Sequence, residues 1–304
     1  MVGRIDTLNP LYATTEPEVD ASRLLFSSLY TFDTAGALSK SLAESMSIDK
    51  SGKVYTVKIR SDASWHDGQK LTAKDVAFTI NLIKKPAAMS PLRVNWQDVA
   101  VRAVDEVTVE FTLPALYAAF PHALTFAVLP AHILEDVPAG AIRENTFSRY
   151  PVGSGPFSFR LLQTVGGQDG YKIIQMAAFD KYFKGSPMVN RFEVHAHASS
   201  EKAVSSLRAG VVNAVSGVPA SKIDSLNGAG YSVSRHTVNS GVYALFNVSR
   251  PILKDKRVRQ ALQVGTDTKA LRSQFINYFP NPDKIRKKKE NNPYKKITDW
   301  FGVG

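Results

Sequence analysis

The clearest pattern of apolar and polar positions lies in the first third of the chain. Residues 54–60 alternate between apolar and polar side chains, which predicts a half-buried strand. Asp67 and Gly68 then interrupt the alternation as a turn. Between Thr72 and Pro86 the apolar residues recur at helical spacing, and an acidic residue follows Thr72 by three positions, as in a capping box. This stretch therefore predicts a strand, a tight turn and an amphipathic helix of about three turns.

Two further patterns predict hairpins beside this unit. Residues 41–48 form a strand candidate that meets the strand at 54–60 across a short polar connection. Residues 99–103 and 107–113 alternate on either side of an acidic turn, which predicts a second hairpin. Residues 116–134 are apolar but contain two prolines, so we expect short pieces there rather than one long helix.

The remaining patterns alternate between strand and helix signals. We expect strands at 157–162, 171–176, 192–198, 211–218, near 231–236 and at 242–247, and helices at about 18–30, 199–209, 221–226 and 254–264. This order predicts an α/β protein with a mixed sheet, in which a hairpin-rich subdomain is inserted between two parts of a larger one. The boundary is expected near Tyr150.

Composition is that of a folded globular chain. The 304 residues are 44% hydrophobic and 21% charged, and a folded chain of this length buries roughly 75% of its unfolded surface. The chain has no Cys, which excludes disulfides and thiolate chemistry. No run of about 18 apolar residues appears, so we expect no membrane-spanning helix, and no secretory signal pattern precedes Asp6.

The net charge of +11 is unevenly distributed. Residues 283–304 hold seven Lys or Arg and three Asp or Glu, a surplus of four in a short tail. A basic, proline-containing tail of this kind favours a disordered or loosely held segment. Nucleic-acid binding through the tail is an alternative, but the aromatic interleaving and the basic folded face that would support it are missing.

Candidate chemical motifs are weak. The turn formed by Gly153, Ser154 and Gly155 could suggest a phosphate cradle, yet no Gly-Lys-Ser/Thr follows and the next residue is proline. His66 and Asp67 could suggest acid-base chemistry, although a surface His beside a turn Asp explains the pair more simply.

His195 and His197 lie two apart on a predicted strand, so they can face one side and could bind a metal. Two ligands do not complete a site, and structural or solvated histidines are the simpler interpretation. No Gly-x-Ser-x-Gly elbow occurs. We therefore expect no catalytic residues, no cofactor and no metal, and a protein that is not an enzyme.

Six stretches together resemble family 5 extracellular solute-binding proteins, the peptide- and nickel-binding components of ABC importers. The stretches follow the family's order over residues 7 to about 272: 8–11 (LNPL), 42–45 (LAES), 65–79 (WHDGQKLTAKDVAFT), 152–157 (VGSGPF), 182–185 (YFKG) and 255–262 (DKRVRQAL). The resemblance implies a periplasmic-binding-protein-like α/β fold of type II, the peptide-binding class, with a ligand cleft between two lobes.

The resemblance also implies a division of the chain. Residues 1–35 and 150–250 would form the main part of the first lobe, with 36–149 as its inserted subdomain. Residues 251–275 would form the crossover and the start of the second lobe, and 276–304 the basic tail. Nearly all of the second lobe would then be missing, and a signal and lipid-anchor Cys would stand before the first residue. The 65–79 stretch becomes a structural part of the inserted subdomain, with its turn away from the cleft.

Ligand-contacting positions of the first lobe are also implied by the resemblance. They are Tyr30, Thr31, Trp96, Phe126 and Ala127, with Phe246 and Asn247 near the crossover. Plain core packing is an open alternative for Tyr30, Trp96 and Phe126.

The implied function is binding of peptides or similar small ligands and their delivery to ABC permease subunits, by a monomer that is periplasmic or extracellular. The membrane would be reached only through a partner or a missing lipid anchor, and no nucleic-acid partner is expected. Two alternatives remain: a ligand-sensing or regulatory domain of the same fold, and a truncated fragment without function that carries a basic nucleic-acid-binding tail.

Overall fold

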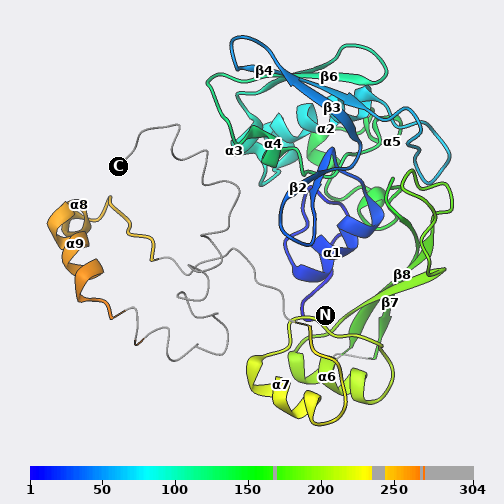
Figure 1. Cartoon of the computed structure of the whole chain (residues 1–304), viewed down its shortest axis with the longest axis vertical. Coiled ribbons are helices and arrows are strands. Elements are labelled where there is room, and N and C mark those ends of the chain that lie inside the picture. Colours follow the sequence, from blue (N-terminus) through cyan, green and yellow to red (C-terminus); the bar gives the residue numbers. More distant parts are fainter. Residues whose placement is uncertain (167–169, 235–243, 268–269, 271–304) are drawn as a thin grey trace. The chain divides into compact units, whose positions relative to one another are not determined.

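The computed structural model describes residues 1–166, 170–234, 244–267 and 270 of the 304 (Figure 1). The chain divides into two compact units, Met1–Gly217 and Val218–Gly304, and each is considered by itself. No helix in the described part of the chain is long and apolar enough to cross a membrane.

The first helix, α1 (Glu16–Leu25), begins at a complete capping box. The Thr15 hydroxyl accepts from the backbone N–H of Glu18, and the Glu18 carboxylate accepts from the backbone N–H of Thr15. The sequence predicted a helix continuing to residue 30, which is wrong. Phe26 is extended, and the residues after it pair with another segment, so their backbone groups are not available to the helix.

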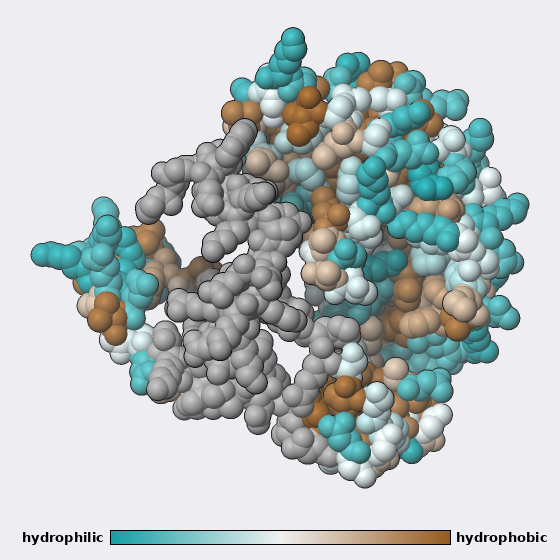
Figure 2. All heavy atoms as spheres, viewed as in Figure 1, coloured by the Kyte–Doolittle hydropathy of each residue, from teal (hydrophilic) through white to brown (hydrophobic). Residues whose placement is uncertain are grey.

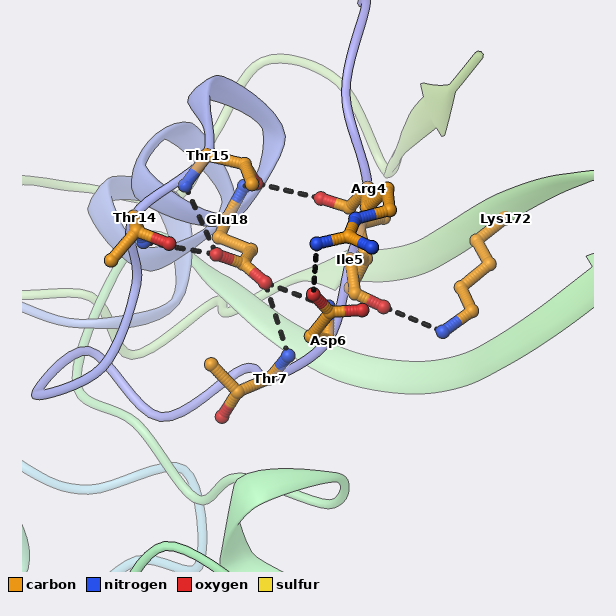
Figure 3. A network of polar contacts seen from close by, with 8 residues as sticks. All are labelled: Arg4, Ile5, Asp6, Thr7, Thr14, Thr15, Glu18 and Lys172. Carbon is orange, nitrogen blue, oxygen red and sulfur yellow. Dashed lines mark hydrogen bonds and ion pairs between the residues drawn. The ribbon is translucent and has the colours of Figure 1, made fainter. Parts of the chain in front are cut away.

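Glu18 also organises the chain before α1. Its side chain is only 2% exposed, and its two carboxylate oxygens accept hydrogen bonds from the backbone N–H groups of four residues, at 2.7–3.2 Å. The donors are Asp6, Thr7, Thr14 and Thr15 (Figure 3). A single buried carboxylate therefore holds the segment leading into α1 against the start of the helix.

A short hairpin and a four-stranded sheet follow. β1 (Tyr30–Phe32) pairs with β2 (Leu38–Lys40), and the larger sheet has the order β3-β4-β6-β5, with every pair antiparallel. Its strands are β3 (Ala43–Ile48), β4 (Val54–Ile59), β5 (Ala100–Ala103) and β6 (Thr108–Thr112). The predicted alternation is confirmed in β4, where Tyr55, Val57 and Ile59 are buried and the residues between them are not.

Helix α2 (Ala73–Lys84) packs against β5 and β6 of this sheet. Its predicted capping box is confirmed: the Asp75 carboxylate accepts from the backbone N–H of Thr72 at 2.8 Å. The other oxygen of this buried carboxylate accepts from the backbone N–H of Ala131, also at 2.8 Å. Asp75 thus joins the start of α2 to the segment that begins α5 (Ala131–Leu134).

The short pieces predicted for residues 116–134 are confirmed as α4 (Phe120–Ala123) and α5, and further short helical turns lie before and after them. The further turns are η1 (Pro86–Ala88), α3 (Arg93–Trp96), η2 (Ala139–Ala141) and η3 (Thr146–Ser148).

A further sheet of this unit has three antiparallel strands in the order β7-β8-β9. They are β7 (Phe157–Val165), β8 (Tyr171–Ala178) and β9 (Arg191–Ala196). A parallel bridge between Val2 and His197 adds the start of the chain beyond the end of β9. Helix α1 contacts β7 and β9 of this sheet. Buried residues of the three-stranded sheet and of the four-stranded sheet belong to one hydrophobic core.

Helix α6 (Ser200–Arg208) follows β9 and ends, as predicted, at Gly210 with φ +71. The predicted strand at 211–218 is wrong: residues 211–217 contain no strand. The backbone N–H groups of Val211 and Val212 instead turn back to the carbonyl of Ser206, and Gly217 has a left-handed φ of +67.

The second unit contains α7 (Ala220–Asn227), α8 (Pro251–Lys254) and α9 (Lys256–Gly265). The helix predicted over about 254–264 is confirmed as α9, which begins at Lys256 because Asp255 is its N-cap. The Asp255 side chain accepts from the backbone N–H of Arg257. Residues 231–234 and 244–247 are not in strands, contrary to prediction. The rest of those two predicted strands, and the basic tail, lie outside the described residues.

Candidate ligand-binding site

Four of the seven predicted site residues come from two segments that run side by side. The backbone N–H of Tyr30 donates to the carbonyl of Leu124 at 3.1 Å, and that of Val128 donates to the carbonyl of Ser27 at 3.0 Å. Ser28 and Ala127 form an antiparallel bridge between these two bonds. Residues 27–31 and 124–128 therefore place Tyr30, Thr31, Phe126 and Ala127 close together, and we call these two segments the paired edge.

The side chains of the paired edge differ in their exposure. Thr31 is exposed and Ala127 half-buried, whereas Tyr30 is 6% and Phe126 is 8% exposed. Burial raises the pKa of the Tyr30 phenol above its ordinary value, so Tyr30 stays a neutral hydroxyl. Thr31 is thus the predicted site residue of this edge whose side chain reaches solvent most fully.

Trp96 lies beneath the paired edge in a buried aromatic cluster. Its ring centroid is 5.2 Å from that of Phe126 and 5.9 Å from that of Phe120, both in edge-to-face geometry, and Trp96 is 3% exposed. Phe111 completes the cluster, 5.5 Å from Phe120. This arrangement is core packing, the open alternative for Trp96 and Phe126.

An exposed aromatic pair beside the paired edge was missed by the sequence reasoning. Phe32, the last residue of β1, is 50% exposed, and its ring lies 6.0 Å from the ring of exposed His122. The sequence signal that could have revealed this pair is Phe32, an aromatic residue at the start of a polar loop. Hydrophilic and hydrophobic residues are interspersed on the visible face of this unit (Figure 2).

The remaining two predicted site residues lie in the second unit. Phe246 is 37% exposed and Asn247 is exposed. The Asn247 side-chain oxygen accepts from the backbone N–H of Ser249 at 3.0 Å and from its hydroxyl at 2.6 Å. Asn247 therefore orders the turn that precedes α8.

The Gly153-Ser154-Gly155 segment has a packing role. A Cβ at Gly153 would lie 1.8 Å from the carbonyl oxygen of Leu25, and one at Gly155 would lie 2.3 Å from that of Leu24. The backbone N–H of Gly155 donates to Leu25 at 2.9 Å. The glycines thus allow the segment to touch the end of α1, which explains the motif without a phosphate.

Ser154 completes this contact from within. It is 0% exposed; its hydroxyl accepts from the backbone N–H of Ser27 at 3.2 Å, and its carbonyl accepts from the Ser27 hydroxyl at 2.7 Å. These bonds fix the start of the paired edge, because Ser27 also accepts from Val128. The site's position is therefore set by backbone packing around 153–155.

His66 and Asp67 have separate partners. Both ring nitrogens of His66 contact the 153–155 segment, while the Asp67 carboxylate lies 2.8 Å from Nε2 of His132. His66 and Asp67 therefore bond to different structural partners and not to each other, as an acid-base pair would.

His195 and His197 lie side by side, as the strand periodicity predicted. They are 8% and 2% exposed, their ring centroids are 6.3 Å apart, and both rings contact Tyr171. Nε2 of His195 lies 2.9 Å from the carboxylate of Glu193. Among the described residues no group of three or more His, Cys, Asp or Glu could hold a metal.

Hollows of different size lie among the described residues of the first unit. One of about 680 Å³ lies between β9 and residues 211–216, one of about 540 Å³ lies beside His66, and a polar one of about 230 Å³ lies near the start of α1. In the smallest, the Arg143 guanidinium stacks 5.4 Å from the Tyr12 ring centroid, and the hollow also contains Arg149 and Glu18. None of these hollows is lined by the paired edge.

The fold is shared with solved solute-binding proteins. The chain is similar to the oligopeptide-binding protein AppA of Bacillus subtilis in complex with a nonapeptide, with a TM-score of 0.70 and 28% identity over 90% of this chain and 54% of that one. It is equally similar to NikZ of Campylobacter jejuni in complex with Ni(L-His), with a TM-score of 0.70 and 26% identity over 91% of this chain and 54% of that one. The protein is thus a mixed α/β fold of the type II periplasmic-binding-protein class.

Sequence comparison identifies the family. Residues 37–285 match the family model described as bacterial extracellular solute-binding proteins, family 5 Middle. AppA of Bacillus subtilis is 32% identical over 286 residues, which cover 91% of this chain and 50% of AppA, and the periplasmic oligopeptide-binding protein OppA of Escherichia coli is 30% identical over 151 residues, which cover 42% of this chain and 28% of OppA. The chain belongs to the family 5 bacterial extracellular solute-binding proteins.

The match has a defined extent. The chain spans half the length of AppA and about half of the two solved chains. The relatives AppA and OppA are named as oligopeptide-binding proteins, and the family is described as one of extracellular solute-binding proteins.

Proposed function

We propose that this chain supplies the first lobe of a solute-binding component of an ABC transporter, and that the ligand is a peptide or a similar small molecule. The observation that carries the proposal is the paired edge, where backbone pairing brings together four of the positions implied by the family resemblance. One of the four, Thr31, is exposed, and the next residue, Phe32, is 50% exposed. The relatives named for oligopeptide binding support the ligand class.

The partners and location follow from the same role. The ligand would be delivered to ABC permease subunits by a monomer that is periplasmic or extracellular, with the membrane reached through a partner or a lipid anchor. The protein would perform no chemistry and would use no cofactor or nucleic acid. The family relationship favours this role over a ligand-sensing domain or a fragment with a nucleic-acid-binding tail.

Ligand binding by a two-lobed protein depends on closure. A ligand favours the closed state only by the difference between its affinities for the closed and open states. A first lobe alone would provide one side of that cleft. The lobe boundaries predicted from the sequence, with 36–149 as the inserted subdomain, stay predictions.

The test uses this chain completed with the second half of AppA. Titration calorimetry against a panel of mixed-sequence peptides is expected to show saturable binding, and Thr31→Arg is expected to weaken it at least about tenfold by placing a bulky charge on the paired edge. Thr164→Arg, at an exposed Thr on β7, is the matched control and should bind like the parent. If both variants weakened peptide binding equally, or if neither weakened it, the paired edge would not be part of the ligand site.

A further inference from the structure

His66 is attached to the 153–155 segment through three hydrogen bonds. Its backbone N–H donates to the carbonyl of Gly153 at 2.8 Å. Its ring Nδ1 lies 3.2 Å from the backbone N–H of Gly153, and its ring Nε2 lies 3.0 Å from the carbonyl oxygen of Gly155. The ring of Phe179 packs edge-on against the imidazole, with centroids 4.9 Å apart.

These partners fix the protonation state of the imidazole. Gly153 N–H is a donor, so Nδ1 must be an unprotonated acceptor. The carbonyl of Gly155 is an acceptor, so the ring proton lies on Nε2. A second proton on Nδ1 would place two donors opposite each other and remove the Gly153 bond.

We propose that His66 is an acid-sensitive latch that joins the turn after β4 to the 153–155 segment and opens when its imidazole is protonated. The latch secures two contacts at once. Gly155 also donates to Leu25 at the end of α1, so loosening 153–155 releases the segment that positions Ser27 and the paired edge.

The surroundings of His66 let a proton reach the ring. The imidazole lines the hollow of about 540 Å³, whose charged residues are Asp67 from its own turn, Arg160 from β7, and Asp180 and Lys181 after β8. Asp67 is engaged by His132 at 2.8 Å. The charges of Arg160 and Lys181 balance those of Asp67 and Asp180. The hollow therefore carries no net negative charge that would stabilise a protonated imidazole.

The direction of the pH dependence follows from burial. Desolvation lowers the pKa of His66 below its ordinary value of 6.5; the Gly155 carbonyl and Asp67 oppose this shift, and Arg160 adds to it. The latch is therefore fully closed above pH 6.5, and its contribution to stability is lost as the pH falls through the folded-state pKa.

The test combines a ring titration with amide exchange in the intact chain. By nitrogen-detected NMR, His66 is expected to show the Nε2–H tautomer at pH 7.5 and a titration midpoint below 6.5. The protection of the Gly153 amide, corrected for intrinsic exchange, is expected to fall about fivefold to tenfold between pH 7.5 and pH 5, as the loss of one hydrogen bond requires.

Two variants separate the latch from general acid loosening. In His66→Asn the side-chain oxygen can accept from Gly153 without titrating, so the drop in protection should disappear, whereas His122→Asn, at an exposed histidine, should behave like wild type. An equal drop in His66→Asn and wild type would overturn the proposal. If His66→Asn fails to fold, an Nδ1–H tautomer or a midpoint at or above 6.5 in the wild type would overturn it.

Discussion

Replacement of Glu18 by glutamine tests how strongly one buried carboxylate holds the start of the chain. One carboxylate oxygen accepts from Asp6 and Thr7, and the other from Thr14 and Thr15. In Glu18→Gln the remaining side-chain oxygen keeps its two backbone N–H donors. The new NH2 group is itself a donor, so it cannot accept from the other two backbone N–H groups. Hydrogen bonds to a charged group contribute about 1.5–3 kcal/mol each, so the loss of two predicts a destabilisation of about 3–6 kcal/mol.

The charge of Glu18 also predicts a pH dependence. Burial raises the pKa of this carboxyl, but the four backbone donors together outweigh burial and hold its pKa below the ordinary value of 4.5. The stabilisation is therefore present above pH 4.5 and is lost as the pH falls through the folded-state pKa. The difference between wild type and Glu18→Gln should shrink over that range.

Urea denaturation from pH 7 to pH 3 measures both effects. Glu16→Gln is the matched control, since Glu16 is exposed in the same helical turn and should cost under about 1 kcal/mol. The reasoning would be refuted if Glu18→Gln cost no more than Glu16→Gln, or if its cost were the same at every pH.

Two further substitutions test the packing around the paired edge. Gly153→Ala should destabilise the protein by at least about 3 kcal/mol by urea denaturation, because its Cβ would lie 1.8 Å from a backbone oxygen, whereas Gly140→Ala, with its nearest atom at 3.7 Å, should be tolerated. Trp96→Ala should cost about 3–5 kcal/mol by creating a cavity in the aromatic cluster; a cost under about 1 kcal/mol would show that Trp96 is not core.

Local patterns predicted the elements whose stability depends on neighbours in sequence. The strand at 54–59, the capping box of α2 and the interrupted apolar region each follow from alternation, cap residues or proline, and the structure confirms them. The glycine at the end of α6 is confirmed for the same reason: its left-handed φ is a local requirement.

Long-range pairing could not be predicted in the same way. α1 ends five residues early because residues 27–30 form hydrogen bonds with a segment about 100 positions away. The strand expected at 211–218 had a suitable apolar composition, but its first two amides turn back to α6. Neither competing partner is visible in the local pattern.

The candidate site also combines features that local sequence predicts with features that depend on long-range pairing. The residue types at Tyr30 and Phe126 are consistent with both a ligand surface and a core, and only the backbone pairing shows that these two residues are neighbours. The roles of His66 and Gly153 depend on a contact across 87 positions, which composition and spacing do not encode.

Peptide binding by the chain completed with the second half of AppA tests the central claim most directly. After incubation with a mixture of nonapeptides and removal of free peptide, native mass spectrometry is predicted to show the protein with one peptide retained. Absence of any retained peptide across the panel, from a completed chain that is folded, would contradict a peptide-binding first lobe.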